Sequence, residues 1–309
     1  MSVRILVCDH MDVEGVDKLR SEGFSVDVKP SIRKEELAKI VHEYDVLVVR
    51  SRTKVTRDIT ERGKRLRVVA RAGAGLDNID MAAAEERGIT VLNTPEAPAE
   101  SVAELAIGLM LTLARKISLA DASMKNGQWL KNEMEGYVLE GKTLGLIGLG
   151  NIGTRVAKIA KAIGVGILIT KRTPPSPELL EALEAEFVPL EELLRRSDIV
   201  SIHVPLTRET ERMIGAAEVG LMKEGAFLVN TSRGGIVDED ALLTALRTRK
   251  LGGAALDVYE FEPPGKFELV RLPNVVCTPH IGAQTVEAQR AASTLIAEKI
   301  IRFFKGPSS

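Results

Sequence analysis

The stretch T-L-G-L-I-G-L-G-N-I-G, which ends at Gly153, constrains the fold of this chain more than any other part of the sequence. Leu144–Leu149 is a short apolar run of the kind found in buried strands of parallel sheets. Gly148, Gly150 and Gly153 follow the spacing G-x-G-x-x-G, and Thr154–Ala162 continues with helical periodicity. The first glycine permits a tight turn, the second lets the backbone approach a phosphate, and the third lets the helix pack on the strand. This order predicts a binding site for the pyrophosphate of a dinucleotide.

Glycines also mark ordinary turns, so the spacing alone admits a purely structural interpretation. A second apolar strand, Gly166–Thr170, follows the predicted helix at the distance that a dinucleotide-binding unit requires. The complete strand–turn–helix–strand pattern therefore favours the dinucleotide site.

The composition limits the classes of function. The 309 residues carry a formal net charge of −1, which gives no electrostatic basis for binding nucleic acid or an anionic membrane surface. Cys8 and Cys277 lie in strand-like apolar runs, so we expect two buried thiols in a reducing compartment, with no disulfide and no metal. The N-terminus lacks the layout of a signal peptide, and Leu105–Ala114 is too short to span a membrane. We therefore expect a cytoplasmic protein.

Strands and helices alternate along the chain, which predicts an α/β fold with doubly wound parallel sheets. The other predicted strands are Val3–Asp9, Phe24–Val28, Val46–Val49, Arg67–Ala70, Ile89–Leu92, Asp198–Val204, Ala226–Thr231, Gly253–Val258 and Asn274–Thr278. The other predicted helices are Asp12–Glu22, Arg33–His42, Met81–Arg87, Glu178–Ala185, Leu190–Arg196, Ala217–Met222, Asp240–Thr248 and Thr285–Phe304.

One further segment, Pro98–Leu119, is nearly continuous in its apolar character. Ser101 and Glu104 have the spacing of a capping box, and a helix that is apolar on most faces must be buried. Met124–Glu140, which contains the single tryptophan Trp129, is predicted to be an irregular extension over a surface. We expect this whole region to form much of a homodimer interface.

In open α/β sheets, ligands bind beyond the carboxyl ends of the strands. Arginines, carboxylates and a histidine follow several of the predicted strands, in Arg50–Thr53, Arg71–Gly75, Asn230–Gly235, Asp257–Glu262 and Thr278–Ala283. Because the carboxyl ends of parallel strands share one edge, we expect these segments to converge on one rim.

Three of these side chains have the chemistry for hydride transfer to a ketone. Arg233 offers a guanidinium that binds a carboxylate bidentately, although a surface arginine capping the next helix fits the same position. Histidine is the side chain type that can give a proton to a carbonyl oxygen near neutral pH, so His280 is the candidate donor, whereas the other three histidines are interpreted as structural or solvated. Glu262 can orient that histidine, but taken alone it fits a solvated loop carboxylate before Pro263 and Pro264 better than a catalytic residue. Only the three together favour catalysis.

The chain resembles the D-isomer-specific 2-hydroxyacid dehydrogenases, and most closely the short D-3-phosphoglycerate dehydrogenases that have no regulatory domain. The motifs that carry the resemblance are R-S-R-T-K-V-T, R-A-G-A-G-L-D-N-I-D, S-V-A-E, G-L-I-G-L-G-N-I-G, H-V-P-L-T-R-E-T, N-T-S-R-G-G-I-V-D, L-D-V-Y-E-F-E-P and T-P-H-I-G-A. The resemblance implies two Rossmann-like domains, with a dinucleotide-binding domain of residues 98–284 inserted into a flavodoxin-like substrate-binding domain. The latter would comprise residues 1–97 and a C-terminal helix, residues 285–309, that returns to it.

The same resemblance implies roles for individual residues. Arg233, Glu262 and His280 take the family's catalytic positions, and Asp257 would hold the nicotinamide carboxamide. The cofactor would contact Gly148, Gly150, Asn151, Ile152, Gly153, Lys171, Arg172, Val204, Pro205, Thr231, Asp257 and Gly282. The substrate would contact Arg50, Ser51, Arg52, Gly73, Ala74 and Gly75, with the two arginines facing a distal anionic group such as a phosphate.

Two positions depart from the family pattern. NAD-dependent members carry an acid at the end of the second strand, where this chain has Lys171 and Arg172, as NADP-using glyoxylate/hydroxypyruvate reductases do. A carboxylate repels a 2′-phosphate and an arginine attracts one, so NADP is modestly favoured over NAD. Alternatively, both side chains are solvated loop charges and NAD is held by the remaining contacts. Pro98 replaces an asparagine that is common in phosphoglycerate dehydrogenases, which leaves the exact substrate open.

The sequence thus predicts a homodimeric oxidoreductase that transfers a hydride between a nicotinamide cofactor and a small D-2-hydroxy acid or its keto acid. The first candidate is D-3-phosphoglycerate dehydrogenase, in serine biosynthesis, and the second is an NADPH-dependent glyoxylate/hydroxypyruvate reductase. A non-catalytic dinucleotide-sensing protein on the same fold is the alternative from another class. The arginine–glutamate–histidine set argues against it, because a sensor needs no acid–base histidine.

Overall fold

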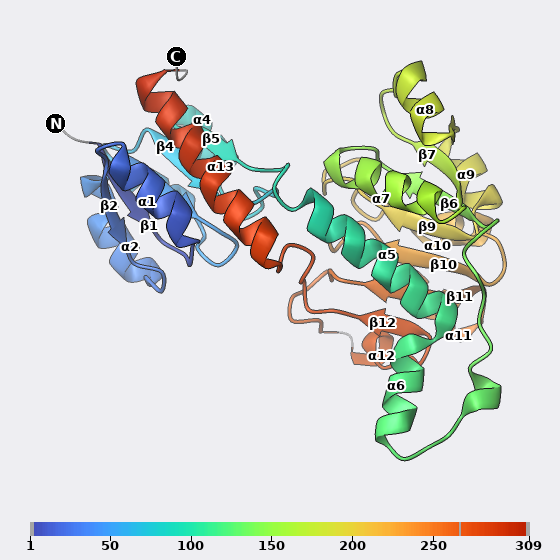
Figure 1. The fold of residues 1–309 in the computed structure, drawn as a ribbon. Helices are drawn as coiled ribbons and strands as arrows, with labels where there is room; N and C mark the ends of the chain where they lie inside the picture. The colour runs from blue at the N-terminus through green and yellow to red at the C-terminus, as the bar shows by residue number, and fades with distance from the viewer. Residues whose placement is uncertain (1–2, 266, 307–309) are drawn as a thin grey trace. The chain divides into compact units, whose positions relative to one another are not determined.

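The computed structural model describes residues 3–265 and 267–306, and the chain divides into two compact units (Figure 1). The first unit consists of two separate stretches, residues 1–101 and 283–309, and the second is the intervening stretch, residues 102–282. No helix within the described ranges is both long and apolar enough to cross a membrane.

The first unit contains a five-stranded parallel sheet with the order β2-β1-β3-β4-β5. Its strands are β1 (Arg4–Val7), β2 (Ser25–Val28), β3 (Val46–Val49), β4 (Val68–Arg71) and β5 (Thr90–Asn93). This is the flavodoxin-like order, so the predicted fold of this part is confirmed. The chain leaves β1 for β2 on one side and continues to β3 on the other, which places a topological switch point between β1 and β3.

Helices cover both faces of this first sheet. They are α1 (Val13–Ser21), α2 (Lys34–Ile40) with the 3-10 turn η1 (Val41–Glu43), α3 (Arg57–Arg62), α4 (Met81–Glu86) and α13 (Val286–Lys305). Successive strand residues face opposite sides. Ile5 therefore lies in one core with Ile300 of α13, while Leu6 lies in the other with Leu37 of α2.

The second unit contains a seven-stranded parallel sheet with the order β12-β11-β10-β9-β6-β7-β8. Its strands are β6 (Thr143–Ile147), β7 (Gly166–Thr170), β8 (Ala185–Phe187), β9 (Ile199–Ile202), β10 (Ala226–Asn230), β11 (Leu251–Leu256) and β12 (Val275–Cys277). The first six strands in chain order have the Rossmann arrangement, which confirms the prediction, and the switch point lies between β6 and β9.

Helices also cover both faces of the second sheet. They are α5 (Ala99–Arg115), α7 (Asn151–Ala162), α8 (Pro177–Leu183), α9 (Leu190–Arg196), α10 (Ala216–Leu221), α11 (Glu239–Arg247) and α12 (Phe267–Val270). Two further elements, α6 (Ile117–Lys125) and the 3-10 turn η2 (Lys131–Glu133), contribute no residue to either core of this sheet. Leu146 of β6 packs in the same core as Met110 of α5 and Val156 of α7. The neighbouring Ile147 packs with Leu193 of α9 in the core on the other face.

The long helix after Pro98 differs from the prediction at both ends. α5 begins at Ala99, so Ser101 lies inside the first turn and is not the N-cap of a capping box. Proline is well accommodated next to a helix start because its missing N–H would find no intrahelical partner there. The helix ends at Arg115, because Lys116 adopts the left-handed conformation with φ of 52°, and α6 then runs to Lys125. The predicted continuous helix to Leu119 was therefore wrong.

Other corrections concern short elements and one cysteine. The predicted helix Glu178–Ala185 ends at Leu183, because the chain forms the three-residue edge strand β8 from Ala185. α3, α6, α12 and the 3-10 turns were not predicted, since short helices give weak periodicity. Cys8 is buried, but Cys277 is exposed at the end of the edge strand β12, so the expectation of two buried thiols was wrong.

Candidate active site

The glycine turn after β6 has the shape that a dinucleotide requires. Gly148 has a φ of +99°, and a Cβ there would lie 2.4 Å from the His203 carbonyl oxygen. A Cβ on Gly153 would lie 2.4 Å from the Gly148 carbonyl oxygen. Around Gly150, in contrast, no heavy atom of the described chain lies within 4 Å of the position of an added Cβ. The two outer glycines are therefore fixed by close packing, while the middle one leaves its backbone open to an approaching phosphate.

The start of α7 supplies the donors for such a phosphate. Gly150 is the N-cap of this helix, and Asn151 and Ile152 are its first residues, so no side chain caps the free N–H groups. Val204 and Pro205 follow β9, the strand on the other side of the switch point. The glycine turn thus fits a dinucleotide by its own geometry.

No acidic residue follows β7 directly. Lys171, which is partly buried, and the exposed Arg172 come immediately after Thr170. A hydrogen bond from Thr207 lowers the pKa of Glu209, and the charge of Arg172 acts in the same direction. Glu209 therefore shares this part of the surface with Arg172.

Arg233 lies in the loop after β10, and Asn230 fixes the backbone of that loop. Asn230 is 2% exposed; its Oδ1 accepts hydrogen bonds from the Ser232 N–H at 3.0 Å and the Ser232 hydroxyl at 2.8 Å. Its Nδ2 donates to the Arg233 carbonyl oxygen at 2.9 Å, and Arg233 Nη1 donates to the Ser232 carbonyl oxygen at 2.7 Å. The buried Oγ1 of Thr231 has no hydrogen-bond partner among the described residues. A buried hydroxyl of this kind is suited to a polar atom of a ligand.

Glu262 and His280 form a hydrogen-bonded pair. The His280 Nδ1 lies 2.7 Å from Glu262 Oε2, and because an ionised carboxylate can only accept, Nδ1 carries the proton. The Tyr259 N–H donates to Glu262 Oε1 at 3.3 Å and holds the carboxylate in turn. His280 Nε2 has no partner within the described part of the chain, so it is the nitrogen that can exchange a proton with a ligand.

Asp257 holds the loop that carries His280. Its Oδ1 accepts hydrogen bonds from the Thr278 hydroxyl at 2.6 Å and the Ile281 N–H at 2.8 Å, and its Oδ2 accepts from the Gly282 N–H at 2.8 Å. Its backbone carbonyl accepts from the His280 N–H at 2.9 Å. His280 has a φ of +53°, a left-handed conformation that costs free energy in a non-glycine residue. These four hydrogen bonds stabilise that conformation.

The loops of Arg233, Glu262 and His280 follow three neighbouring strands, β10, β11 and β12. Gly234 joins the first two of these loops, since a Cβ on it would lie 1.7 Å from the Tyr259 carbonyl oxygen. The second unit therefore brings the three predicted catalytic residues to one edge of its sheet. An arginine and a carboxylate–imidazole pair on one edge can bind a carboxylate and transfer a proton.

His203 differs from His280 in its surroundings. Burial lowers the pKa of His203 to about 4, so its imidazole is neutral near pH 7. Its Nε2 lies 3.0 Å from the Ser201 hydroxyl, and its buried Nδ1 meets no partner in the described ranges. This histidine is structural, and it cannot supply a proton near neutral pH.

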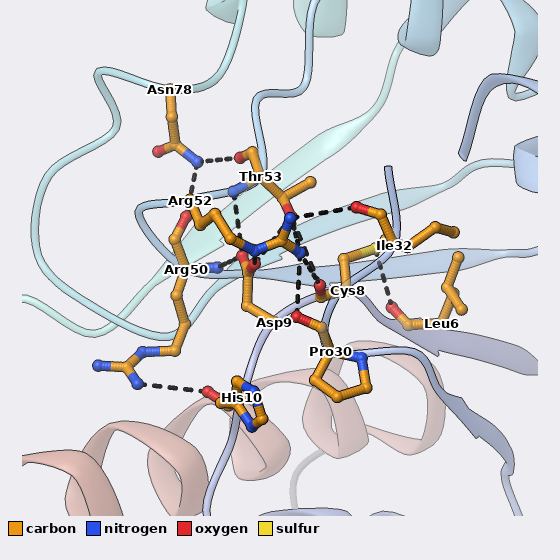
Figure 2. Close-up of polar contacts among 10 residues, drawn as sticks. All are labelled: Leu6, Cys8, Asp9, His10, Pro30, Ile32, Arg50, Arg52, Thr53 and Asn78. Carbon is orange, nitrogen blue, oxygen red and sulfur yellow. Dashed lines mark hydrogen bonds and ion pairs between the residues drawn. The ribbon is translucent and has the colours of Figure 1, made fainter. Parts of the chain in front are cut away.

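The two predicted arginines of the first unit have different environments (Figure 2). Arg52 Nε lies 2.9 Å from Asp9 Oδ1, and its Nη atoms donate to backbone carbonyl oxygens. Arg50 extends away from this cluster, and its Nη1 donates to the His10 carbonyl oxygen at 3.2 Å. Burial lowers the pKa of Arg50. Ser51 is exposed between the two arginines.

The loop after β4 offers fewer free amides than its sequence suggests. The Gly73 N–H donates to the Thr94 hydroxyl at 2.9 Å, so it is already engaged. Arg71 Nη1 donates to the Gly75 carbonyl oxygen, and Asn93 Nδ2 donates to the Ala74 carbonyl oxygen at 2.6 Å. The N–H groups of Ala74 and Gly75 make no hydrogen bond with the rest of the described chain.

Sequence analysis missed Asp9, Asn230 and the loop-holding contacts of Asp257. Asp9 was hidden because the predicted strand Val3–Asp9 extends past the true end of β1 at Val7. If the strand had been predicted to end at Val7, Asp9 would have been selected in the same way as Arg50, as a charged side chain just after the carboxyl end of a strand. Over the described residues, no group of three or more His, Cys, Asp or Glu side chains could hold a metal ion.

Comparisons with known proteins agree with this geometry. Residues 107–282 match the family described as D-isomer specific 2-hydroxyacid dehydrogenase, NAD binding domain. The chain is 49% identical over 302 residues to the hydroxypyruvate reductase of Thermotoga maritima, with 97% of both chains covered. It is 48% identical to the D-3-phosphoglycerate dehydrogenase of Methanocaldococcus jannaschii; there the match covers 98% of this chain but only 58% of the relative. A crystal structure of a glyoxylate reductase from Paecilomyes thermophila aligns with a TM-score of 0.91 at 31% identity, covering 100% of this chain and 97% of that one.

A Rossmann-type unit with an arginine and a glutamate–histidine pair on its carboxyl edge defines the class of dinucleotide-binding dehydrogenases. The chain belongs to the D-isomer-specific 2-hydroxyacid dehydrogenase family. It spans about 58% of the length of its archaeal phosphoglycerate dehydrogenase relatives.

Proposed function

We propose that this chain interconverts a small D-2-hydroxy acid and its 2-keto acid. The observation that carries the proposal is the 2.7 Å contact between His280 and Glu262, on the same sheet edge as the Arg233 loop. A bound nicotinamide dinucleotide would supply or accept the hydride. Arg233 would bind the substrate carboxylate with its guanidinium. His280 Nε2 would give a proton to the carbonyl oxygen in reduction and remove it from the hydroxyl in oxidation, and Glu262 would stabilise the charged ring.

The first substrate that we propose is D-3-phosphoglycerate, with 3-phosphohydroxypyruvate as its keto acid, and the second is hydroxypyruvate or glyoxylate. Relatives named for each activity are similar to the chain at 42–49% identity. Arg50 supports the phosphorylated substrate because its guanidinium can bind a second anionic group. The test is kcat/KM for 3-phosphohydroxypyruvate, hydroxypyruvate, glyoxylate and pyruvate with NADH and NADPH. A preference for hydroxypyruvate over its phosphorylated form would select the second candidate.

For the cofactor, we propose a modest preference for NADPH. Lys171 and Arg172 follow β7, and the acid that would repel a 2′-phosphate is missing there. Arg172 is exposed, so its contact with a phosphate contributes on the order of 1.4 kcal/mol, which is about tenfold in affinity. Arg172→Ala should raise KM for NADPH and leave KM for NADH nearly unchanged. A wild-type enzyme that prefers NADH at low and high salt would refute this proposal.

We also propose that the chain forms a homodimer through the region of residues 98–140. Large apolar side chains of this region are exposed in the single chain, among them Trp129 at 76% and Val138 at 69%. The others are Leu111, Ile117, Leu119, Met124 and Tyr137. A second copy of the chain is the partner that could bury such a surface in the same way on both sides. Light scattering at micromolar concentration should give twice the chain mass, and Trp129→Lys should shift it toward the monomer. A monomeric wild type would contradict the proposal.

A further inference from the structure

The buried face of helix α11 carries a carboxylate. Glu239, the first residue of this helix, is 8% exposed and lies on the same buried face as Leu242 and Leu246. The helix does not use this side chain as a cap, because the N-cap residue Asp238 already accepts hydrogen bonds from two N–H groups of the first turn. Burying a carboxylate costs free energy unless the group is hydrogen-bonded. Glu239 therefore requires a partner outside its own helix.

That partner is the backbone of the loop after β11. Glu239 Oε1 accepts a hydrogen bond from the Glu260 N–H at 2.7 Å. The carbonyl group of the same peptide belongs to Tyr259 and packs against Gly234, where an added Cβ would lie 1.7 Å from the carbonyl oxygen and 2.8 Å from the Glu260 nitrogen. The peptide between Tyr259 and Glu260 is thus held through its N–H by Glu239 and through its carbonyl by the Arg233 loop.

Tyr259 connects this peptide to the glutamate–histidine pair. Its N–H donates to Glu262 Oε1 at 3.3 Å, and Glu262 Oε2 lies 2.7 Å from His280 Nδ1. Tyr259 is 6% exposed, and its hydroxyl donates to the carbonyl oxygen of Thr278, in the loop of the histidine, at 3.1 Å. Hydrogen bonds at three successive points therefore link Glu239 to the imidazole: at the Glu260 N–H, at the Tyr259 N–H and at the imidazole Nδ1.

A second contact with the same loop lies on the surface. Arg212 Nη2 donates to Glu260 Oε1 at 3.2 Å, and its Nη1 lies 3.5 Å from Asp238 Oδ2. More than half of the Arg212 side chain is exposed, and exposed ion pairs contribute little to the stability of a loop. The buried hydrogen bond of Glu239 is therefore the contact that fixes the peptide.

We propose that Glu239 is a positioning residue for proton transfer, because it holds the Tyr259–Glu260 peptide and thereby keeps Glu262 against His280. This inference rests on the proposed function, since it gives Glu239 a part in the proton transfer proposed for His280. All of these residues belong to the second unit.

The first test removes the acceptor. Glu239→Met keeps a side chain of similar length but leaves the partly buried Glu260 N–H without its partner. At saturating cofactor, kcat should fall about tenfold to a hundredfold for whichever proposed keto acid the wild type reduces faster, 3-phosphohydroxypyruvate or hydroxypyruvate. The Kd of the dinucleotide should stay within about threefold, because Glu239 does not hold the glycine turn. A normal kcat in Glu239→Met would overturn the inference.

The conservative variant separates the hydrogen bond from the charge. Glu239→Gln keeps an oxygen that can accept from the Glu260 N–H, so it should recover kcat to within about threefold of the wild type. A Glu239→Gln enzyme as slow as Glu239→Met would overturn the inference that this hydrogen bond positions the loop.

The matched control is Glu218→Met. Glu218 also lies in the first turn of a helix, α10, and its Oε2 accepts from a backbone N–H, that of Gly215, at 3.0 Å. Gly215 precedes α10 and lies in none of the loops of Arg233, Glu262 and His280. The control should lower the free energy of unfolding and leave kcat unchanged. An equal loss of kcat in both variants would show a general effect of instability and overturn the inference.

A double variant tests whether Glu239 acts through Glu262. In a Glu262→Ala background the contact with His280 is already lost, so adding Glu239→Met should lower kcat by less than about threefold. A further fall as large as that in the wild-type background would show that Glu239 acts by another route and would overturn the inference.

The last test needs no substrate. Hydrogen exchange of the peptide that covers residues 257–262 should be faster in Glu239→Met than in the wild type and in Glu218→Met, because the Glu260 N–H loses its acceptor. Unchanged exchange would overturn the positioning role. Should Glu239→Met not fold, Glu239→Asp carries these tests, because an aspartate suits the start of a helix but is one methylene too short to reach the Glu260 N–H.

The kinetic and exchange experiments fail in different ways. If the wild type reduces neither keto acid, the proposed function is wrong, whereas the exchange result still decides whether Glu239 holds the loop. If the wild type is active and exchange is unchanged in the Glu239 variant, the proposed function stands and the positioning inference falls.

Discussion

Replacing Asp257 with asparagine should detach His280 from its position beside Glu262. The carboxylate is buried and accepts hydrogen bonds from the Thr278 hydroxyl, the Ile281 N–H and the Gly282 N–H. An amide has one oxygen, so either the Ile281 or the Gly282 N–H would face an NH2 group. Leaving one backbone donor unpaired in a buried site costs about 1–3 kcal/mol. The left-handed conformation of His280, which costs about 1–2 kcal/mol, would no longer be fully compensated.

If the whole cost falls on the catalytically competent loop, kcat should drop about tenfold to a hundredfold. The assay combines kcat at saturating cofactor, the dinucleotide Kd from fluorescence titration, and the free energy of unfolding. Asp198→Asn is the matched control. The Asp198 carboxylate also accepts a hydrogen bond from a backbone N–H, that of Thr143, but it does so at the amino ends of β6 and β9, away from the carboxyl edge of the sheet. The control variant should lower stability and spare kcat. A normal kcat in Asp257→Asn would refute the positioning argument, and a weaker dinucleotide Kd with normal kcat would leave Asp257 as a cofactor contact only.

Four further predictions follow from single contacts. His280→Ala should lower kcat by about 10²–10⁴ while dinucleotide affinity stays within a few fold, and near-normal turnover would remove His280 from the mechanism. Arg233→Lys should raise KM and lower kcat, because a point charge cannot replace a bidentate fork; a wild-type kcat/KM would place the carboxylate contact elsewhere. Gly234→Ala should abolish activity or folding, since its Cβ would lie 1.7 Å from the Tyr259 carbonyl oxygen, and a fully active variant would contradict that packing. Burial lowers the pKa of His203 to about 4, so between pH 6.5 and 4 the unfolded chain binds more protons than the folded one. The free energy of unfolding should therefore decrease by up to about 3 kcal/mol as the pH is lowered over this range. His203→Gln should remove most of that decrease, and an equal pH dependence of stability in the variant and the wild type would contradict the prediction.

Much of the fold could be predicted from the sequence because its signals are local. The glycine spacing, the apolar strands and the turns after them depend on neighbouring residues, and both predicted sheets are present with the expected topologies. The failures also have local causes. α5 starts before Ser101 and breaks at Lys116, where a left-handed residue interrupts an apolar run that gives no sign of a stop. β8 is a three-residue edge strand with no apolar run of its own.

The predicted site residues illustrate which properties a sequence can give. Placing Glu262 and His280 on one edge needs only the order of the strands, since β11 and β12 are neighbours and Leu256 pairs with Cys277. Asp257 and Thr278 come directly after these two strands, and the Thr278 hydroxyl donates to Asp257 Oδ1 at 2.6 Å. Chemistry and strand ends together were therefore sufficient to select these positions.

The direction of each side chain was beyond the sequence, and Arg50 and Arg52 show why. Both are arginines of one R-S-R turn, so composition, spacing and position on the strand treat them alike. What separates them is a set of acceptors from distant parts of the chain: the Asp9 carboxylate and the carbonyl oxygens of Pro30 and Ile32 bind one guanidinium. Those carbonyl groups belong to a loop without any motif. Which of two such arginines keeps donors available for a ligand depends on the hydrogen bonds that the fold already makes, and these can be counted only in three dimensions.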